Sequence, residues 1–175
     1  HRVGSRYVTA ATGMDMPKIR NNPAKAGMLY KKVTDRLTIK DCTGLYMDYV
    51  ELTIKATKPD IVVLDMGDKF ANRTGDRSDI YLKEAAIHAR NIAKQYKCAI
   101  LWMSQLSAEA EGKIMVDQSM LEGSKTGKAA EADLMLLISK KPDIEGQDSN
   151  DPQRHIRLAK NKLTGWHGTV HVELD

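Results

Sequence analysis

The sequence is poor in cysteine and in long apolar runs. Its 175 residues include two cysteines, Cys42 and Cys98, which lie far apart and share no CxxC spacing. This pattern excludes a disulfide framework and a cysteine zinc site, and it is typical of a reducing compartment such as the cytoplasm. No apolar stretch approaches the length needed to cross a bilayer, so we expect no membrane-spanning segment and a cytoplasmic location.

A phosphate-binding loop of the form GxxxxGK[ST] is missing as well. Residues 121–128 (LEGSKTGK) contain two glycines and two lysines. However, Gly123 and Gly127 are one residue too close for that loop, and Lys128 is followed by alanine. We therefore interpret residues 122–128, called the basic loop below, as a flexible basic segment before a short helix.

The composition that remains is that of one globular domain. Hydrophobic residues make up 42% and charged residues 29% of the chain, and the net charge is +4. A chain of this length buries a core without disulfides or metal. The basic excess is compatible with a polyanionic partner, but it is small and scattered along the sequence.

Apolar periodicity predicts an α/β fold. Asn22 and Pro23 are typical of a helix start leading into 24–33, and a short strand is expected at 37–39. Further helices are expected within 44–57 and over 78–96. Three apolar runs are expected to be strands of a parallel sheet that is buried on both faces. They are residues 61–64, 99–103 and 134–138.

The C-terminal segment differs from these runs. Apolar and polar residues alternate on both sides of Gly165-Trp166-His167-Gly168. This alternation predicts an antiparallel hairpin at a sheet edge.

Two of the apolar runs end in polar residues. Asp65 follows the first, and Ser104-Gln105 follows the second. The carboxyl ends of parallel strands are where open α/β sheets bind ligands. An acid there can hold Mg²⁺, and an amide can bind the terminal phosphate of a nucleotide. The alternatives are an aspartate that caps a turn and a strand that merely ends in polar residues.

Basic residues suggest two further contacts. In the basic loop, backbone amides with Lys125 or Lys128 could bind a nucleic-acid phosphate, and the alternative is a solvated turn. Lys160 and Lys162 flank Asn161 and so share one face of a strand. They could stabilise charge on a phosphoryl group in a neighbouring subunit, or simply protect an exposed edge strand from aggregation.

In their order, these segments resemble the RecA-like ATPase domain of hexameric replicative DNA helicases, the DnaB type and the phage primase-helicases. KPDIVVLD is similar to the Walker B strand of that family, and AILWMSQL to the strand with its γ-phosphate sensor. MLEGSKTGKAAEAD is similar to the DNA-binding loop, and KNKLTGWHG to the strand whose Lys and Arg finger reach the adjacent subunit. The resemblance implies a mostly parallel sheet flanked by helices, with a C-terminal antiparallel hairpin.

The resemblance also implies functional roles. Asp65 would coordinate the Mg²⁺ of ATP, and Gln105 would sense the γ-phosphate. Ser124 and Lys125, with Lys128 nearby, would contact single-stranded DNA in the channel of a hexameric ring. Lys160 and Lys162 would act in trans. Lys162 occupies the place where the family usually has arginine, which replaces a planar bidentate group with a point charge.

On this interpretation, residues 1–175 form one partial RecA-like domain. Residues 1–57 are a helical lead-in, 58–140 carry the Walker B strand, sensor strand and DNA loop, and 155–175 carry the finger strand and hairpin. The Walker A loop and catalytic glutamate would precede His1, so we expect no useful ATP hydrolysis by this chain alone. The resemblance points to a phage-encoded helicase motor. Alternatives are a non-helicase RecA-type ATPase, such as a recombinase or loader, and an inert DNA-binding or assembly module.

Overall fold

The chain divides into two units, His1–Asp41 and Cys42–Asp175, in a computed structural model that describes residues 2–70, 78–123, 125–141 and 152–173. The division falls inside the segment that we expected as a helical lead-in, residues 1–57.

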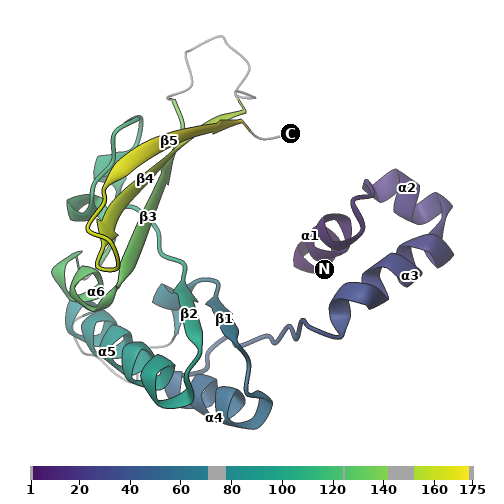
Figure 1. Ribbon diagram of the computed structural model, residues 1–175, viewed down its shortest axis with the longest axis horizontal. Coiled ribbons are helices and arrows are strands. Elements are labelled where there is room, and N and C mark those ends of the chain that lie inside the picture. The colour runs from purple at the N-terminus through teal and green to yellow at the C-terminus, as the bar shows by residue number, and fades with distance from the viewer. Residues whose placement is uncertain (1, 71–77, 124, 142–151, 174–175) are drawn as a thin grey trace. The chain divides into compact units, whose positions relative to one another are not determined.

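The first unit consists of three helices, α1 (Arg2–Thr12), α2 (Met16–Asn21) and α3 (Pro23–Thr34) (Figure 1). The start of α3 confirms the capping prediction, because Asn22 Oδ1 accepts a hydrogen bond from the Lys25 amide at 3.3 Å. The strand predicted at 37–39 is wrong, since these residues are irregular. Leu37 and Ile39 are 40% and 49% exposed and have no strand to pair with among the described residues.

In the second unit, two helices pack on a parallel pair of strands. The helices are α4 (Met47–Thr57) and α5 (Ser78–Tyr96), and the strands are β1 (Ile61–Leu64) and β2 (Ala99–Trp102). Ile54 from α4 and Ile92 from α5 are 2% and 1% exposed at the centre of this core, which also takes in Leu64. The strands run in the register Ile61 to Ala99 through Leu64 to Trp102.

The outer face of this parallel pair differs from the prediction. Ile61, Val63 and Leu101 are 61%, 52% and 49% exposed, whereas Leu64 is buried. Burial on both faces was therefore the wrong expectation for these strands within the described residues. A continuous apolar run does not by itself say whether one or both faces are covered.

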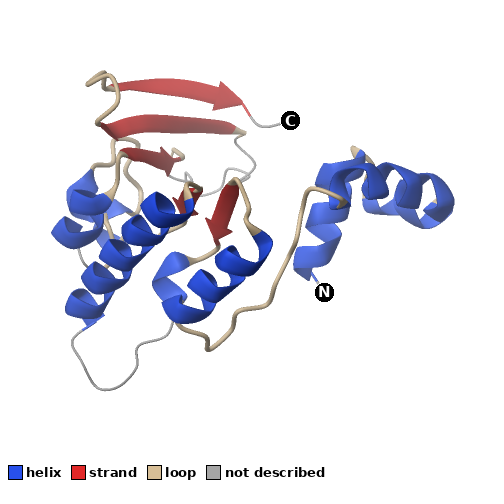
Figure 2. Cartoon of the chain, turned by 60° about the horizontal axis from the view of Figure 1, so that its bottom comes forward, coloured by secondary structure: helices blue, strands red, loops and turns tan. Residues whose placement is uncertain are grey.

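The second sheet has three antiparallel strands in the order β3 (Leu134–Ser139), β4 (Gln153–Asn161) and β5 (Gly168–Glu173) (Figure 2). The predicted C-terminal hairpin is confirmed as β4 and β5. However, β3 pairs with β4 and not with the parallel strands as expected. Its burial alternates, with Leu137 buried and its neighbours Leu136 and Ile138 exposed, as in an antiparallel sheet with one open face.

Short elements connect the two sheets. Between β2 and β3 these are the 3₁₀ turns η2 (Ala108–Ala110) and η3 (Gln118–Met120) and the helix α6 (Lys125–Glu131). A further 3₁₀ turn, η1 (Gly67–Lys69), follows β1. A second small core joins α6 to β3 through Ala129 and Leu137, with Val116 and Leu121. No helix in the described part of the chain is both long and apolar enough to cross a membrane.

Candidate functional site

Asp65 and Gln105 lie at the same edge of the parallel β1–β2 pair. Leu64 is paired with Trp102 at the carboxyl end of both strands, and the Met103 amide donates to the Leu64 carbonyl at 3.1 Å. Asp65 follows directly after Leu64, and Gln105 lies three residues beyond Trp102. Both residues are exposed at this edge, which leaves them accessible to a ligand.

The chain turns sharply after Asp65. The Asp65–Met66 peptide bond is cis, and the Gly67 amide donates to the Met103 carbonyl at 3.0 Å. A Cβ at Gly67 would overlap the ring of Trp102, so only glycine lets η1 pack flat on that ring. This packing brings Asp68, the next residue, over the end of β2.

Asp68 and Lys128 form a buried ion pair at this point. The Lys128 ammonium donates to both carboxylate oxygens of Asp68 at 3.0 Å, and the side chains of Lys128 and Asp68 are 7% and 13% exposed. Trp102 Nε1 donates to Asp68 Oδ1 at 2.9 Å, and Ser104 Oγ donates to Oδ2 at 2.5 Å. A buried charge needs such partners, because transferring a charged group out of water without them costs free energy.

Two more acceptors complete the surroundings of Lys128. Its ammonium donates to Ser104 Oγ at 2.7 Å and to the Glu122 carbonyl at 2.6 Å. The helix α6 begins at Lys125, so Lys128 lies in a helix and not in the flexible segment that we expected before it. Its side chain thus contacts three other segments, namely η1, the end of β2 and the start of the basic loop at Glu122. We refer to Asp68, Trp102, Ser104, Lys128 and the Glu122 carbonyl as the lysine cluster.

The backbone joins the basic loop to the end of β2 as well. The Glu122 amide donates to the Gln105 carbonyl at 3.1 Å, and the Ser107 amide donates to the Met120 carbonyl at 2.7 Å. Leu106 and Leu121 form an isolated antiparallel bridge. The segment that contains Gln105 is therefore hydrogen-bonded along its length to the approach to the basic loop.

Of the three residues expected to contact DNA, only Lys128 has a described side chain. Ser124 and the side chain of Lys125 lie outside the described residues. Lys128 is described, and its ammonium is buried within the lysine cluster rather than facing solvent. This position does not favour a direct phosphate contact by Lys128. The same ion pair occupies Asp68, which lies three residues after Asp65.

Lys160 and Lys162 meet at the C-terminal end of α6. Lys160 Nζ donates to the carbonyls of Ala129 and Ala130, and Lys162 Nζ donates to that of Ala130 at 3.1 Å. Lys162 also pairs with Asp133 at 3.4 Å. Cations at this end of a helix satisfy carbonyls that have no partner within the helix. Burial lowers the pKa of the Lys160 ammonium, and the charge of Lys162 lowers it further.

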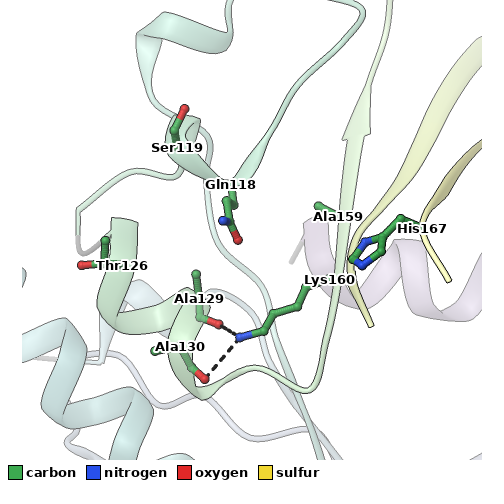
Figure 3. Close-up of a pocket in the computed structure, with 8 residues that line it drawn as sticks. All are labelled: Gln118, Ser119, Thr126, Ala129, Ala130, Ala159, Lys160 and His167. Carbon is green, nitrogen blue, oxygen red and sulfur yellow. Dashed lines mark hydrogen bonds between the residues drawn. The ribbon is translucent and has the colours of Figure 1, made fainter. Parts of the chain in front are cut away.

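A cavity of about 610 Å³ opens beside Lys160. Figure 3 shows the lysine side chain reaching from β4 to the carbonyls of Ala129 and Ala130 on α6. Alanine methyl groups and a few polar side chains line the cavity, and the ammonium at its edge is hydrogen-bonded to the two carbonyls. The lining residues are Gln118, Ser119, Thr126, Ala129, Ala130, Ala159, Lys160 and His167.

The sheet of β3, β4 and β5 carries a histidine pair. Nδ1 of His155 and Nδ1 of His171 lie 2.5 Å apart, and the two rings stack edge to face. Throughout the described residues, no group of three or more His, Cys, Asp or Glu side chains is arranged to hold a metal ion.

Comparison with known proteins identifies the fold that carries this geometry. No protein-family model and no curated protein sequence matches the chain. A solved structure of an ATPase domain superposes with a TM-score of 0.80 at 19% identity, covering 97% of this chain and 65% of that one. A structure of a DnaB-like replicative helicase and its interactions with primase gives 0.79 at 18% identity. The match covers 98% of this chain and 46% of the helicase.

The chain has the RecA-like α/β fold of these two solved structures. The fold class predicted from the sequence is thereby confirmed, and so is the resemblance in structure to DnaB-type helicases. The chain spans 65% and 46% of the two matched chains, so it corresponds to part of each. At this identity, the comparison carries the fold and not the roles of individual residues.

Sequence reasoning misses the lysine cluster within this RecA-like fold. Trp102 falls in the apolar run 99–103, which predicts only a strand, and its N–H bond to Asp68 leaves no sequence signal. Ser104 stands next to Gln105, and Asp68 stands three residues after Asp65. A second polar residue near each of two strand ends is a usable hint that further contacts form there.

Proposed function

We propose that this chain is part of the ATP-driven motor of a replicative DNA helicase that moves along single-stranded DNA. The observation that carries the proposal is the position of Asp65 and Gln105 at one edge of the parallel strands, in a fold that matches helicase ATPase domains. That edge is where open α/β sheets bind nucleotides.

In this proposal, Asp65 holds the Mg²⁺ of ATP. Asp65 is exposed at the strand end, and no cluster of three ligands is found among the described residues. The single carboxylate of Asp65 fits Mg²⁺, which is usually bound by one or two carboxylates together with substrate phosphates and waters. When bound, the ion would neutralise charge on the phosphate oxygens.

Gln105 would sense the γ-phosphate. An amide offers both a donor and an acceptor, so its hydrogen bonds can change when the terminal phosphate leaves. Because the Gln105 carbonyl accepts from the Glu122 amide, a shift at Gln105 is felt at the approach to the basic loop. Ser124 and Lys125 of that loop would contact the DNA strand.

Lys160 and Lys162 would stabilise phosphoryl charge in the adjacent subunit of a homo-oligomeric ring, which we propose to be a hexamer. The Lys160 ammonium beside a cavity, with Lys162 close to it, suits that task. We propose that the protein is phage-encoded and works in the host cytoplasm. We further propose that the 175-residue chain alone does not hydrolyse ATP at a useful rate.

The test is DNA-stimulated ATP hydrolysis by the chain and by a form extended upstream of His1. Asp65→Ala in the extended form is expected to lower the rate at least about a hundredfold, because the metal no longer has its protein ligand. Asp60→Ala is the matched control, since Asp60 is an exposed acid just before the opposite end of the same strand.

Two results would contradict the proposal. One is an extended form that neither hydrolyses ATP nor responds to DNA, which would leave a DNA-binding or assembly module as the better interpretation. The other is an equal rate for the Asp65→Ala and Asp60→Ala proteins, which would remove Asp65 from the nucleotide site.

A further inference from the structure

We propose that Lys128 is a positioning residue that couples strand binding at the basic loop to the strand ends carrying Asp65 and Gln105. This inference rests on the proposed function. It assigns to Lys128 a role inside the protein in place of the DNA contact that the sequence suggested.

The contacts give the coupling a physical path. At one end, the Lys128 ammonium holds the Glu122 carbonyl of the basic loop at 2.6 Å. At the other, it holds Asp68 and Ser104 at 3.0 and 2.7 Å. Ser104 directly precedes Gln105, and η1 leads back from Asp68 to Asp65 within three residues.

Competition among the acceptors makes this path responsive. An ammonium group has three protons, and four oxygens lie within 3.0 Å of Lys128 Nζ. If strand binding moves the basic loop, the bond to the Glu122 carbonyl lengthens or shortens. The bonds to Asp68 and Ser104 then adjust in the opposite sense, because the same protons serve both.

Stability alone is a poor explanation for the pair. A buried ion pair often contributes no more than apolar side chains of the same volume, since desolvation offsets the attraction. What an ion pair with hydrogen-bonded surroundings does supply is a fixed geometry among its partners. Here those partners are the three segments that the proposed motor needs to keep in register.

Close packing around Trp102 ties the movement of η1 to the end of β2. Gly67 lies flat against the Trp102 ring, and Trp102 also donates to Asp68. A displacement of Asp68 therefore shifts η1 as a body over the end of β2. Closely packed interiors transmit such shifts because they hold few voids that could absorb them.

The experiment measures three quantities in the form extended upstream of His1. They are the rate of ATP hydrolysis without DNA, the rate at saturating oligo-dT, and the Kd for oligo-dT from fluorescence anisotropy. The variants are Lys128→Met, which keeps the length of the side chain without its charge, and Lys128→Arg, which keeps the charge. Lys83→Met, at an exposed position on α5, is the matched control.

Lys128→Met is expected to reduce the stimulation of hydrolysis by DNA about tenfold, a typical size for coupling between two sites. The rate without DNA and the Kd for oligo-dT should stay near those of the Lys83→Met control. Lys128→Arg should regain part of the stimulation. If Lys128→Met does not fold, the same measurement is made with Ser104→Ala, which removes an acceptor of Lys128 and a donor to Asp68 but leaves the ion pair itself in place.

Each other outcome overturns the inference in a recognisable way. Full stimulation in Lys128→Met means that the basic loop communicates by another route. An equal loss of the rates with and without DNA means that Lys128 has only a structural role. A weaker Kd with full stimulation at saturation means that Lys128 binds DNA directly. An unaltered extended form that lacks DNA-stimulated hydrolysis instead refutes the proposed function, and the inference with it.

Discussion

Removing the charge of Lys128 should strongly destabilise the second unit. Breaking a buried ion pair by deleting one partner typically costs about 3–5 kcal/mol. Two features of the lysine cluster reduce that figure. Asp68 keeps the donors of Trp102 and Ser104, and 13% of its side chain remains in contact with water. We therefore expect Lys128→Met to lower the free energy of unfolding by about 2–4 kcal/mol.

A second substitution should recover part of that loss. In Lys128→Met, the Asp68 carboxylate keeps its charge but has lost its counter-ion. Adding Asp68→Asn removes the charge while its side-chain oxygen still accepts from Trp102. The double variant should therefore be more stable than Lys128→Met by about 1 kcal/mol, although it carries one more substitution.

The assay is urea denaturation followed by tryptophan fluorescence. Both tryptophans, Trp102 and Trp166, lie in the unit Cys42–Asp175, so the signal reports that unit and not the three helices before it. Two results would refute the reasoning. A loss of under about 1 kcal/mol for Lys128→Met would mean that the pair is effectively solvated. A double variant less stable than Lys128→Met would mean that the stranded charge is not the source of the loss.

Two smaller predictions concern the same fold. Gly67→Ala should cost about 1–3 kcal/mol in urea denaturation followed by circular dichroism, because the new methyl group overlaps the Trp102 ring, whereas Gly27→Ala, at a helical position with open space, should be neutral or stabilising. Hydrogen bonds, first that from His88, hold the pKa of Glu51 below its usual range, so the stability they add is present above that range and lost as pH falls through the lowered pKa. Glu51→Gln should flatten this acid limb in thermal unfolding measured against pH, and an unchanged limb would contradict the assignment.

The strand ends were the most predictable part of the site. An apolar run followed by Asp65, and another followed by Gln105, were enough to place both residues at one edge, because parallel strands present their carboxyl ends together. The helix α5 matches its predicted range for a similar reason, since its apolar residues recur at helical spacing along its whole length.

The faces of the strands were less predictable. A run such as Leu134 to Ile138 is apolar at every position, so its sequence does not say which side is covered or which neighbour it pairs with. That choice is made by partners distant in the sequence, here Leu158 and Arg157 of β4 opposite Leu136 and Leu137. Pairing over such separations is a property of the whole fold and leaves little trace in a local pattern.

The role of Lys128 could not be seen in the sequence at all. A lysine in a glycine-rich segment is normally exposed, and its counter-ion Asp68 lies 60 residues earlier in the chain. Only the fold brings the two together, by packing η1 on Trp102 and bending the basic loop back over the end of β2.

The short helix α6 relates the two groups of lysines to each other. Its residue Lys128 reaches the strand ends that carry Asp65 and Gln105, while the carbonyls of Ala129 and Ala130 at its C-terminal end receive Lys160 and Lys162. In the proposed ring, the first set of contacts belongs to the subunit's own nucleotide and the second to that of its neighbour. Because the turns of α6 are hydrogen-bonded to one another, a shift of its backbone at Lys128 would also move the carbonyls that hold the other lysines. The same displacement would then reach two nucleotide sites through one helix.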